Sequence, residues 1–250
     1  MKNLTSLLFA CLLFSFTSPG VESTSVIKPP GTGALRFSGA NSTVALGGNL
    51  PIVGNFTLEL WIKPADLAGA RGILGSRNPI DCSFDLKLGD GRRVDADIGN
   101  GAAWLCTPPS VAFNYGADLW VHLAYVVTPT DYTVYANGDK IGTGSLPGSL
   151  PLLRDTNHRL FLGWSGFPNE YFKGDLSDIR IWNVARTAKQ IANNFNRHLR
   201  SAQGLIAYYP CDEKRGTVLH DTTGNGNDGV LQGGTEWVST SGAAEPITSG

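Results

Sequence analysis

The sequence predicts an all-β chain, built as an antiparallel sandwich of two sheets with one short helix. Gly and Pro contribute 31 and 14 of the 250 residues, which suits many short strands joined by tight turns. Segments that alternate apolar and polar residues recur at short spacing, and such strands bury their apolar faces by stacking in two layers. No repeat of the length of a propeller blade is present.

Residues 55–62 form the clearest predicted strand, because every second residue from Phe56 to Ile62 is apolar. Asn137 and Gly138 separate two strand-like segments, and Asn-Gly is the strongest short signal for a hairpin turn. The other expected strands are residues 34–37, 43–46, 72–75, 83–88, 94–98, 103–106, 120–127, 132–135, 140–142, 159–163, 174–182, 205–209 and 229–231.

Residues 187–199 predict a helix instead. Thr187 and Gln190 have the spacing of a capping box, in which each side chain accepts from a backbone N–H of the first turn. Apolar residues then recur at every fourth position from Ile191 to Leu199, which gives the helix one apolar face. Two positive side chains suit the negative end of the helix dipole and are expected to close the helix: His198 and Arg200.

The N-terminus has the order of a secretory signal peptide. Lys2 precedes an apolar run at residues 7–14, and small and polar residues follow at 18–23. The run is too short to span a bilayer, so we favour cleavage over the alternative of a membrane anchor. Export predicts a secreted, extracellular protein. The expected layout is a signal peptide at 1–23, a linker at 24–33, one domain at 34–238 and a flexible tail at 239–250.

Export would allow the cysteines to form disulfides, because the compartment that receives the protein is oxidising. Cys82 and Cys106 lie in neighbouring strand-like segments and are the expected pair. Cys211 is then left over. We interpret it as a buried thiol, since an apolar run leads into it, with an intermolecular bridge as the alternative.

The charge pattern argues against two classes of binding partner. Charged residues make up 16% of the chain and the formal net charge is -1. Nucleic acid and anionic membranes require clustered Lys and Arg, which the sequence lacks, so neither is expected as a partner.

Six segments carry a family pattern in their order along the chain. They are residues 34–39, 56–64, 120–124 with 135–138, 172–183, 205–213 and 221–229. Together they resemble the laminin-G-like jelly-roll family of the concanavalin A-like lectin and glucanase superfamily. The resemblance implies a jelly roll over residues 34–233. It also implies a function among adhesion modules, lectin-like binders and domains attached to enzymes. Ser177-Asp178 departs from the family, which commonly has paired acids there.

Catalysis has little support in the residues. Glycosidases of this shape need two carboxylates a few ångströms apart, and the glucanase pattern Glu-x-Asp-x-x-Glu is absent. Two Asp pairs have same-face spacing, Asp95 with Asp97 and Asp81 with Asp85, but their polar surroundings favour a solvated strand face. Gly-x-Ser-x-Gly is missing and the four His are scattered, so we predict no enzyme.

A loop dense in oxygen ligands predicts a Ca²⁺ cofactor. Its candidate ligands are Asp221, Asn225, Asn227 and Asp228, because Ca²⁺ prefers carboxylate and amide oxygens. Relatives in the resembled superfamily often carry a structural calcium. The alternative is a plain Asn-Gly turn, in which these residues serve left-handed backbone conformations.

An aromatic loop predicts a glycan site. Its candidate residues are Trp164, Phe167, Asn169, Glu170 and Tyr171, rings and planar polar groups of the kind that stack on and hydrogen-bond to sugars. A second candidate lies around Trp104, Asn114 and Tyr115. The alternative is that these rings cover the ends of the core.

Two sequons, at Asn41 and Asn55, are glycosylation acceptors if the host glycosylates. The function expected from all this is a secreted, non-catalytic binding or adhesion module for an extracellular glycan or protein. Two alternatives stay open: a structural subunit that self-assembles into an extracellular array, and a carbohydrate-active hydrolase.

Overall fold

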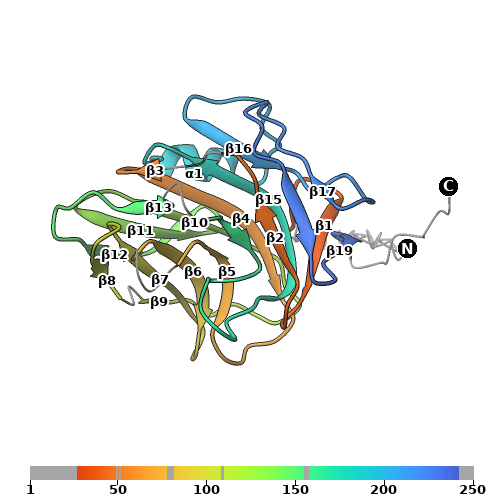
Figure 1. Cartoon of the computed structure of the whole chain (residues 1–250), viewed down its shortest axis with the longest axis horizontal. Coiled ribbons are helices and arrows are strands. Elements are labelled where there is room, and N and C mark those ends of the chain that lie inside the picture. The colour runs from red at the N-terminus through yellow and green to blue at the C-terminus, as the bar shows by residue number, and fades with distance from the viewer. Residues whose placement is uncertain are drawn as a thin grey trace, which may run out of the picture.

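A computed structural model describes residues 27–48, 50, 52–77, 82–107, 110–154 and 158–241. The predicted signal peptide, Asp81 and most of the predicted tail lie outside these residues. Two antiparallel sheets pack face to face, as expected, and helix α1 lies on the outer side of one of them (Figure 1).

The sheet beneath α1, which we call the helix-side sheet, has eight strands in the order β12-β11-β10-β4-β15-β1-β19, with β16 paired to β15. Their bounds are β1 (Gly33–Ser38), β4 (Phe56–Pro64), β10 (Val121–Val127), β11 (Asp131–Ala136), β12 (Asp139–Ser145), β15 (Lys173–Trp182), β16 (Leu205–Tyr209) and β19 (Glu236–Ser239).

The opposite sheet, which we call the loop-side sheet, has nine strands in the order β17-β18-β2-β14-β5-β6-β7-β8, with β9 paired to β7. Their bounds are β2 (Thr43–Leu46), β5 (Arg71–Gly75), β6 (Phe84–Gly89), β7 (Arg93–Gly99), β8 (Trp104–Cys106), β9 (Ser110–Ala112), β14 (Phe161–Leu162), β17 (Val218–Leu219) and β18 (Gly229–Gln232). A separate pair is formed by β3 (Ile52–Val53) and β13 (Leu152–Arg154).

The core lies between the two sheets and is built from alternate residues of each strand. On β4 the predicted apolar face, Phe56 to Ile62, is no more than 1% exposed. Phe56 meets Phe84 of β6 edge to face, with ring centroids 5.2 Å apart. Because burying one large apolar side chain stabilises a fold by about 1.5–3 kcal/mol, this interface holds the two sheets together. The other residues of each strand point outward, and they form the surfaces described below.

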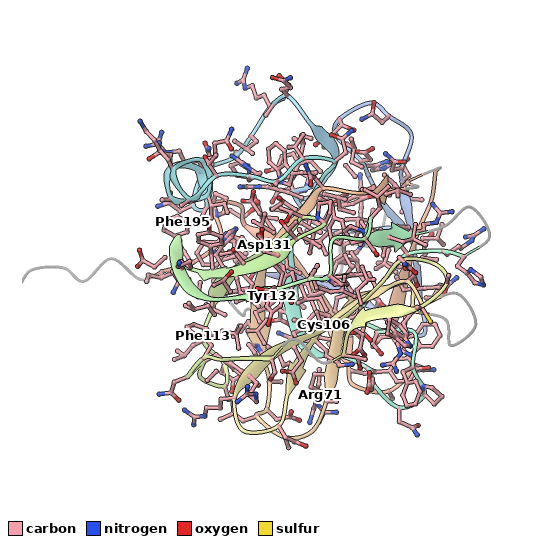
Figure 2. The ribbon with its side chains drawn as sticks, turned by 90° about the vertical axis from the view of Figure 1, so that its left-hand side faces the viewer. Arg71, Cys106, Phe113, Asp131, Tyr132 and Phe195 are labelled. Carbon is pink, nitrogen blue, oxygen red and sulfur yellow. The ribbon has the colours of Figure 1, made fainter. Side chains whose placement is uncertain are left out.

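Helix α1 spans Ala188–Asn194 and has the predicted capping box between Thr187 and Gln190. It ends at Asn194, before Leu199, and side chains of the sheet satisfy carbonyls at its end. Arg180 donates to the carbonyl of Asn194 at 2.9 Å, and the indole of Trp61 donates to that of Phe195 at 2.9 Å. Figure 2 labels Phe195 beside the helix. His198 and Arg200 therefore lie beyond the helix that they were expected to close.

No helix among the described residues is long and apolar enough to cross a membrane.

The expected disulfide is not formed, because Cys82 and Cys106 are free thiols. Strand β7 separates them. The carbonyl of Cys82 accepts from Gly101 next to one edge of β7, whereas Cys106 of β8 pairs with Ile98 on the other edge. Strands two places apart in a sheet are about 9–10 Å apart, whereas a disulfide needs Cα atoms within about 7 Å. Cys211 is a buried free thiol, as expected. Figure 2 labels Cys106 on β8.

Candidate ligand-binding site

The predicted aromatic loop, residues 163–172, lies on the outer face of the loop-side sheet. Two glycines of β5 make this possible. A Cβ on Gly75 would lie 2.0 Å from the carbonyl oxygen of Ser165, and a Cβ on Gly72 would lie 2.2 Å from the nitrogen of Ser165. Because β5 has no side chains there, the loop backbone rests directly on the sheet.

The rings of this loop form a fixed group. Trp164 and Tyr171 stack with centroids 5.8 Å apart and planes 13° apart, and the edge of Phe161 meets Trp164 at 5.3 Å. The indole N–H of Trp164 donates to the carbonyl of Phe167 at 2.8 Å. Trp164 stays half-exposed, so its position is held while part of the ring faces solvent.

Arg77 joins the two aromatic candidates of the sequence. Its guanidinium lies 4.6 Å from the ring centroid of Phe167 and 5.1 Å from that of Trp104. Such contacts hold a cation at a ring face. Trp104 therefore belongs to the same site as the aromatic loop, although 60 residues separate it from Trp164 in the numbering.

The other members of the second candidate do not join this site. Tyr115 is 4% exposed and packs beside Phe113, and Asn114 accepts a hydrogen bond from Arg92. Asn169 is exposed and has a left-handed backbone, φ +65°, so it shapes the turn of the aromatic loop.

Below Arg77 lies a buried pair of carboxylates on neighbouring strands. Asp85 of β6 and Asp97 of β7 are register partners. Arg77 Nη1 lies 2.5 Å from Asp97 Oδ2 and 3.3 Å from Asp85 Oδ2. Lys87 Nζ lies 2.8 Å and 3.3 Å from the same two atoms. Glu170 of the aromatic loop accepts from the hydroxyl of Ser165 at 2.7 Å and lies 3.7 Å from Lys87.

Sequence reasoning missed this pair, because it compared acids along single strands. Of those, Asp95 accepts a hydrogen bond from Ser110 instead of joining Asp97, and Asp81 lies outside the described residues. The signal for the real pair was present in the alternation, since Asp85 and Asp97 both occupy outward positions of strands that were predicted.

The two carboxyl groups have different proton affinities. Burial, together with the negative charge of Asp97, raises the pKa of Asp85 to about 7. Burial would also raise the pKa of Asp97, but the hydrogen bonds of Lys87 and Thr107 and the charges of Lys87 and Arg77 outweigh it and lower that pKa. Asp85 and Asp97 are only 0% and 2% exposed, so they fix Arg77 from below and do not meet solvent.

A hollow of about 340 Å³ opens beside these groups. Its wall is made by Ser76, Arg77, His158, Arg159, Phe161, Trp164 and Gly166. Apolar rings and hydrogen-bond donors thus meet in one concave surface, as in sites for small polar molecules.

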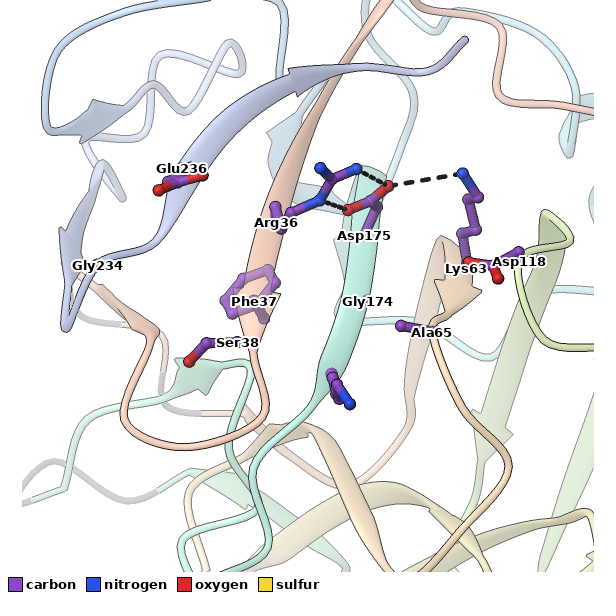
Figure 3. A pocket seen from close by; sticks show the side chains of 11 residues that line it. Arg36, Phe37, Ser38, Lys63, Ala65, Asp118, Gly174, Asp175, Gly234 and Glu236 are labelled. Atoms are coloured by element: carbon purple, nitrogen blue, oxygen red, sulfur yellow. Dashed lines mark hydrogen bonds and ion pairs between the residues drawn. The ribbon is translucent and has the colours of Figure 1, made fainter. Parts of the chain in front are cut away.

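A larger hollow, of about 470 Å³, lies across β19, β1, β15 and β4 on the outer face of the helix-side sheet (Figure 3). A bidentate ion pair spans it, from Arg36 Nε and Nη2 to the two oxygens of Asp175 at 2.8 and 3.0 Å. Lys63 lies 3.9 Å from the same carboxylate. Phe37, the one aromatic residue that lines it, is 1% exposed. This hollow therefore offers a ligand no ring surface.

The loop predicted to bind calcium is held by its own hydrogen bonds. Asp221 Oδ1 accepts from the backbone N–H groups of Tyr208 and Thr223 at 3.1 and 3.0 Å. Its Oδ2 accepts from the backbone and side-chain nitrogens of Asn227 at 3.3 and 3.0 Å. Asn225 and Asn227 also donate their side-chain N–H groups to the carbonyl of residue 206.

The carboxylate oxygens of Asp221 thus accept hydrogen bonds from the chain itself, and calcium binding stays a prediction. Among the described residues, no group of three or more His, Cys, Asp or Glu side chains could hold a metal ion. Asp228 accepts from the backbone N–H of Asp221 and pairs with His220, which ties the loop further. The turn interpretation accounts for these contacts.

Both predicted glycosylation acceptors, Asn41 and Asn55, are exposed. Their modification stays a prediction.

Comparison with known proteins agrees with this architecture. A laminin G family model, described as the concanavalin A-like lectin/glucanases superfamily, matches residues 37–192, and the chain belongs to this family. Pappalysin-1 of Mus musculus is 26% identical over 194 residues, which cover 66% of this chain and 11% of that protein. The chain thus spans about a tenth of the length of this relative.

Solved structures share the fold. A protein of Bacteroides ovatus, described as a candidate carbohydrate-binding protein, has a TM-score of 0.69 and 22% identity, and the match covers 89% of this chain and 63% of that one. A heptameric SAP-like pentraxin of Limulus polyphemus has a TM-score of 0.58 and 19% identity over 83% of this chain and 95% of that one. At these identities the likeness shows the fold alone.

Proposed function

We propose that this chain is an extracellular, non-catalytic module that binds a glycan in the hollow beside Trp164. The observation that carries the proposal is the half-exposed, fixed Trp164 in the wall of a concave surface that also contains hydrogen-bond donors. Sugars present apolar C–H faces and hydroxyl rims, which match rings and donors respectively. The description of the Bacteroides ovatus protein supports the same class of ligand.

The paired carboxylates fit binding better than hydrolysis. A glycosidase needs both carboxyl groups in contact with the scissile bond. Asp85 and Asp97 lie instead beneath Arg77, at 0% and 2% exposure, and bond to Arg77 and Lys87. They act as a support for the guanidinium that Phe167 and Trp104 flank. Calcium is not part of the proposal, because the oxygens of Asp221 are occupied.

The test is a glycan array followed by calorimetric titration of the best ligand. Replacement of Trp164 by Ala should weaken binding by about 2 kcal/mol, roughly 30-fold, as expected for a central aromatic anchor. Trp237→Ala is the matched control. Trp237 is also half-exposed and also donates its indole N–H to a backbone carbonyl at 2.8 Å, but it lies on β19 of the other sheet.

The proposal would be wrong if the wild-type protein bound no glycan, or if the two tryptophan variants lost affinity equally. A protein that released reducing sugar, and lost that activity in Asp97→Asn, would be a hydrolase. A large, uniform particle in light scattering without glycan binding would favour the structural subunit.

A further inference from the structure

The charges around the hollow are unevenly compensated. Arg77 is paired with both Asp85 and Asp97, and Lys87 lies against Asp97 and Glu170. Asp85, Asp97 and Glu170 thus each lie within 4 Å of the charged group of Arg77 or Lys87. The carboxylate of Asp97, 2.5 Å from Arg77 Nη1, therefore already opposes the positive charge of Arg77.

Arg159 differs from Arg77. It lines the same hollow and is exposed, and none of the ion pairs or hydrogen bonds found among the described residues involves its side chain. Its guanidinium keeps all its N–H donors available, in a planar fork that suits the two oxygens of a carboxylate or sulfate. Phe161 and Trp164 line the same wall. One ligand could therefore place a sugar ring against these aromatic rings and an anionic group against the guanidinium of Arg159.

We infer that the glycan of this hollow is acidic: the sugar ring lies against Trp164 and Phe161, and its carboxylate or sulfate pairs with Arg159. This inference rests on the proposed function and narrows it to a ligand class. A volume of about 340 Å³ is at the lower end of the range for small-molecule sites, which suits a short saccharide end more than a long chain.

The experiment compares glycans that differ only in charge. One pair is a uronic-acid oligosaccharide and its carboxyl-reduced neutral counterpart, and the other is a sulfated oligosaccharide and its desulfated form. Affinities are measured for wild type, Arg159→Gln and the control Arg200→Gln at low and high salt. Arg200 is also an exposed arginine, but it lies in the segment between helix α1 and β16, far from the hollow's lining residues in the sequence.

Wild type should bind at least one acidic glycan about tenfold more tightly than its neutral partner, and high salt should reduce the preference. Arg159→Gln should remove the preference and leave the thermal midpoint unchanged, with a smaller loss of affinity for the neutral glycan than for the acidic one, and Arg200→Gln should behave as wild type. The pair that shows the preference identifies carboxylate or sulfate as the anion.

Equal binding of acidic and neutral glycans, or a preference that survives in Arg159→Gln, would overturn this inference and leave the proposed function in place. Failure to bind any glycan would refute the proposed function and this inference with it.

Discussion

The two sheets each bury a cluster of charges on the outer face, and the clusters differ in what covers them. On the helix-side sheet, Glu59, His122, Arg180 and Arg186 are 0%, 0%, 0% and 7% exposed. On the loop-side sheet, Asp85, Asp97 and Lys87 are almost as buried, but the side chain of Arg77 is 19% exposed and lines a hollow.

The helix-side cluster holds helix α1 against the sheet. Glu59 Oε1 lies 2.8 Å from Arg186 Nη1, and Glu59 Oε2 lies 3.5 Å from Arg180 Nη1. The two guanidiniums also donate to backbone carbonyls of α1 and the turn after it, including those of Gln190 and Asn194. Because the last carbonyls of a helix lack partners within it, these bonds dock the helix onto the sheet.

The comparison teaches that buried charge alone does not mark a functional site. Both clusters contain perturbed carboxyl groups and arginines beside rings, since Arg186 lies 3.8 Å from the ring centroid of Trp182. Of the two hollows described above, the one lined by Arg77 touches the loop-side cluster, and neither is lined by Glu59, His122, Arg180 or Arg186. Access to a ligand therefore decides between them.

The largest expected effect is on the helix-side cluster. Glu59→Gln removes the negative charge between Arg186 and Arg180 and should lower the free energy of unfolding by about 3–5 kcal/mol, because Arg186 loses its buried partner and Arg180 keeps only Asp178. Asp85→Asn is the matched change in the other cluster. At pH 6 the wild-type Asp85 is mostly protonated, since its pKa is about 7, so this variant should change stability by about 1 kcal/mol or less. Urea denaturation of both variants measures the difference, and equal losses would contradict the comparison.

The same variants should respond to pH in opposite directions. Burial alone would raise the pKa of Glu59, but His122, Arg186 and Arg180 lower it overall. Glu59 therefore stabilises the fold above the unfolded pKa of about 4.5, and this stability is lost as pH falls through its lower folded pKa. Asp85 has a raised pKa, so its contribution is complete below the unfolded value of about 3.8 and is lost as pH rises through about 7.

Relative to wild type, Glu59→Gln should be least destabilising at acid pH, and Asp85→Asn should become more favourable from pH 5 to pH 9. Denaturation midpoints of the three proteins from about pH 3 to about pH 9 test both trends, because the Glu59 effect changes below the unfolded pKa of about 4.5. Parallel curves for the two variants would show that the clusters do not differ in this way.

A smaller effect is expected from reduction. If Cys82 and Cys106 were bonded, a reducing agent would remove roughly 3–4 kcal/mol of stability in the chain-entropy model. With β7 between them, dithiothreitol should change the free energy of unfolding by less than about 0.5 kcal/mol. If dithiothreitol lowered the free energy of unfolding by several kcal/mol, and did not do so in Cys106→Ser, the predicted disulfide would be present after all.

The smallest effect is expected from calcium. An ion that binds the native state raises the unfolding midpoint by mass action. Because the chain itself occupies both oxygens of Asp221, the midpoint should be the same in Ca²⁺ and in excess EDTA. A rise in Ca²⁺ that Asp221→Asn abolishes would establish the metal site.

Some of these features follow from the sequence by itself. Alternation along residues 55–62, the Asn-Gly turn at 137–138 and the Thr187–Gln190 capping box predict structure because they depend on near neighbours in the chain. For the same reason the sequence by itself predicts the aromatic loop around Trp164 as a candidate site.

Only the tertiary structure decided which strands lie side by side. A two-residue period tells which face of a strand a side chain occupies, but not which strand is its neighbour or in what register. Asp85 opposite Asp97, Arg77 between Trp104 and Phe167, and β7 between two cysteines all depend on that pairing. Pairing is set by how distant segments pack into one core, which is why the sequence supplied the rings of the candidate site and the fold supplied the charged support beneath them.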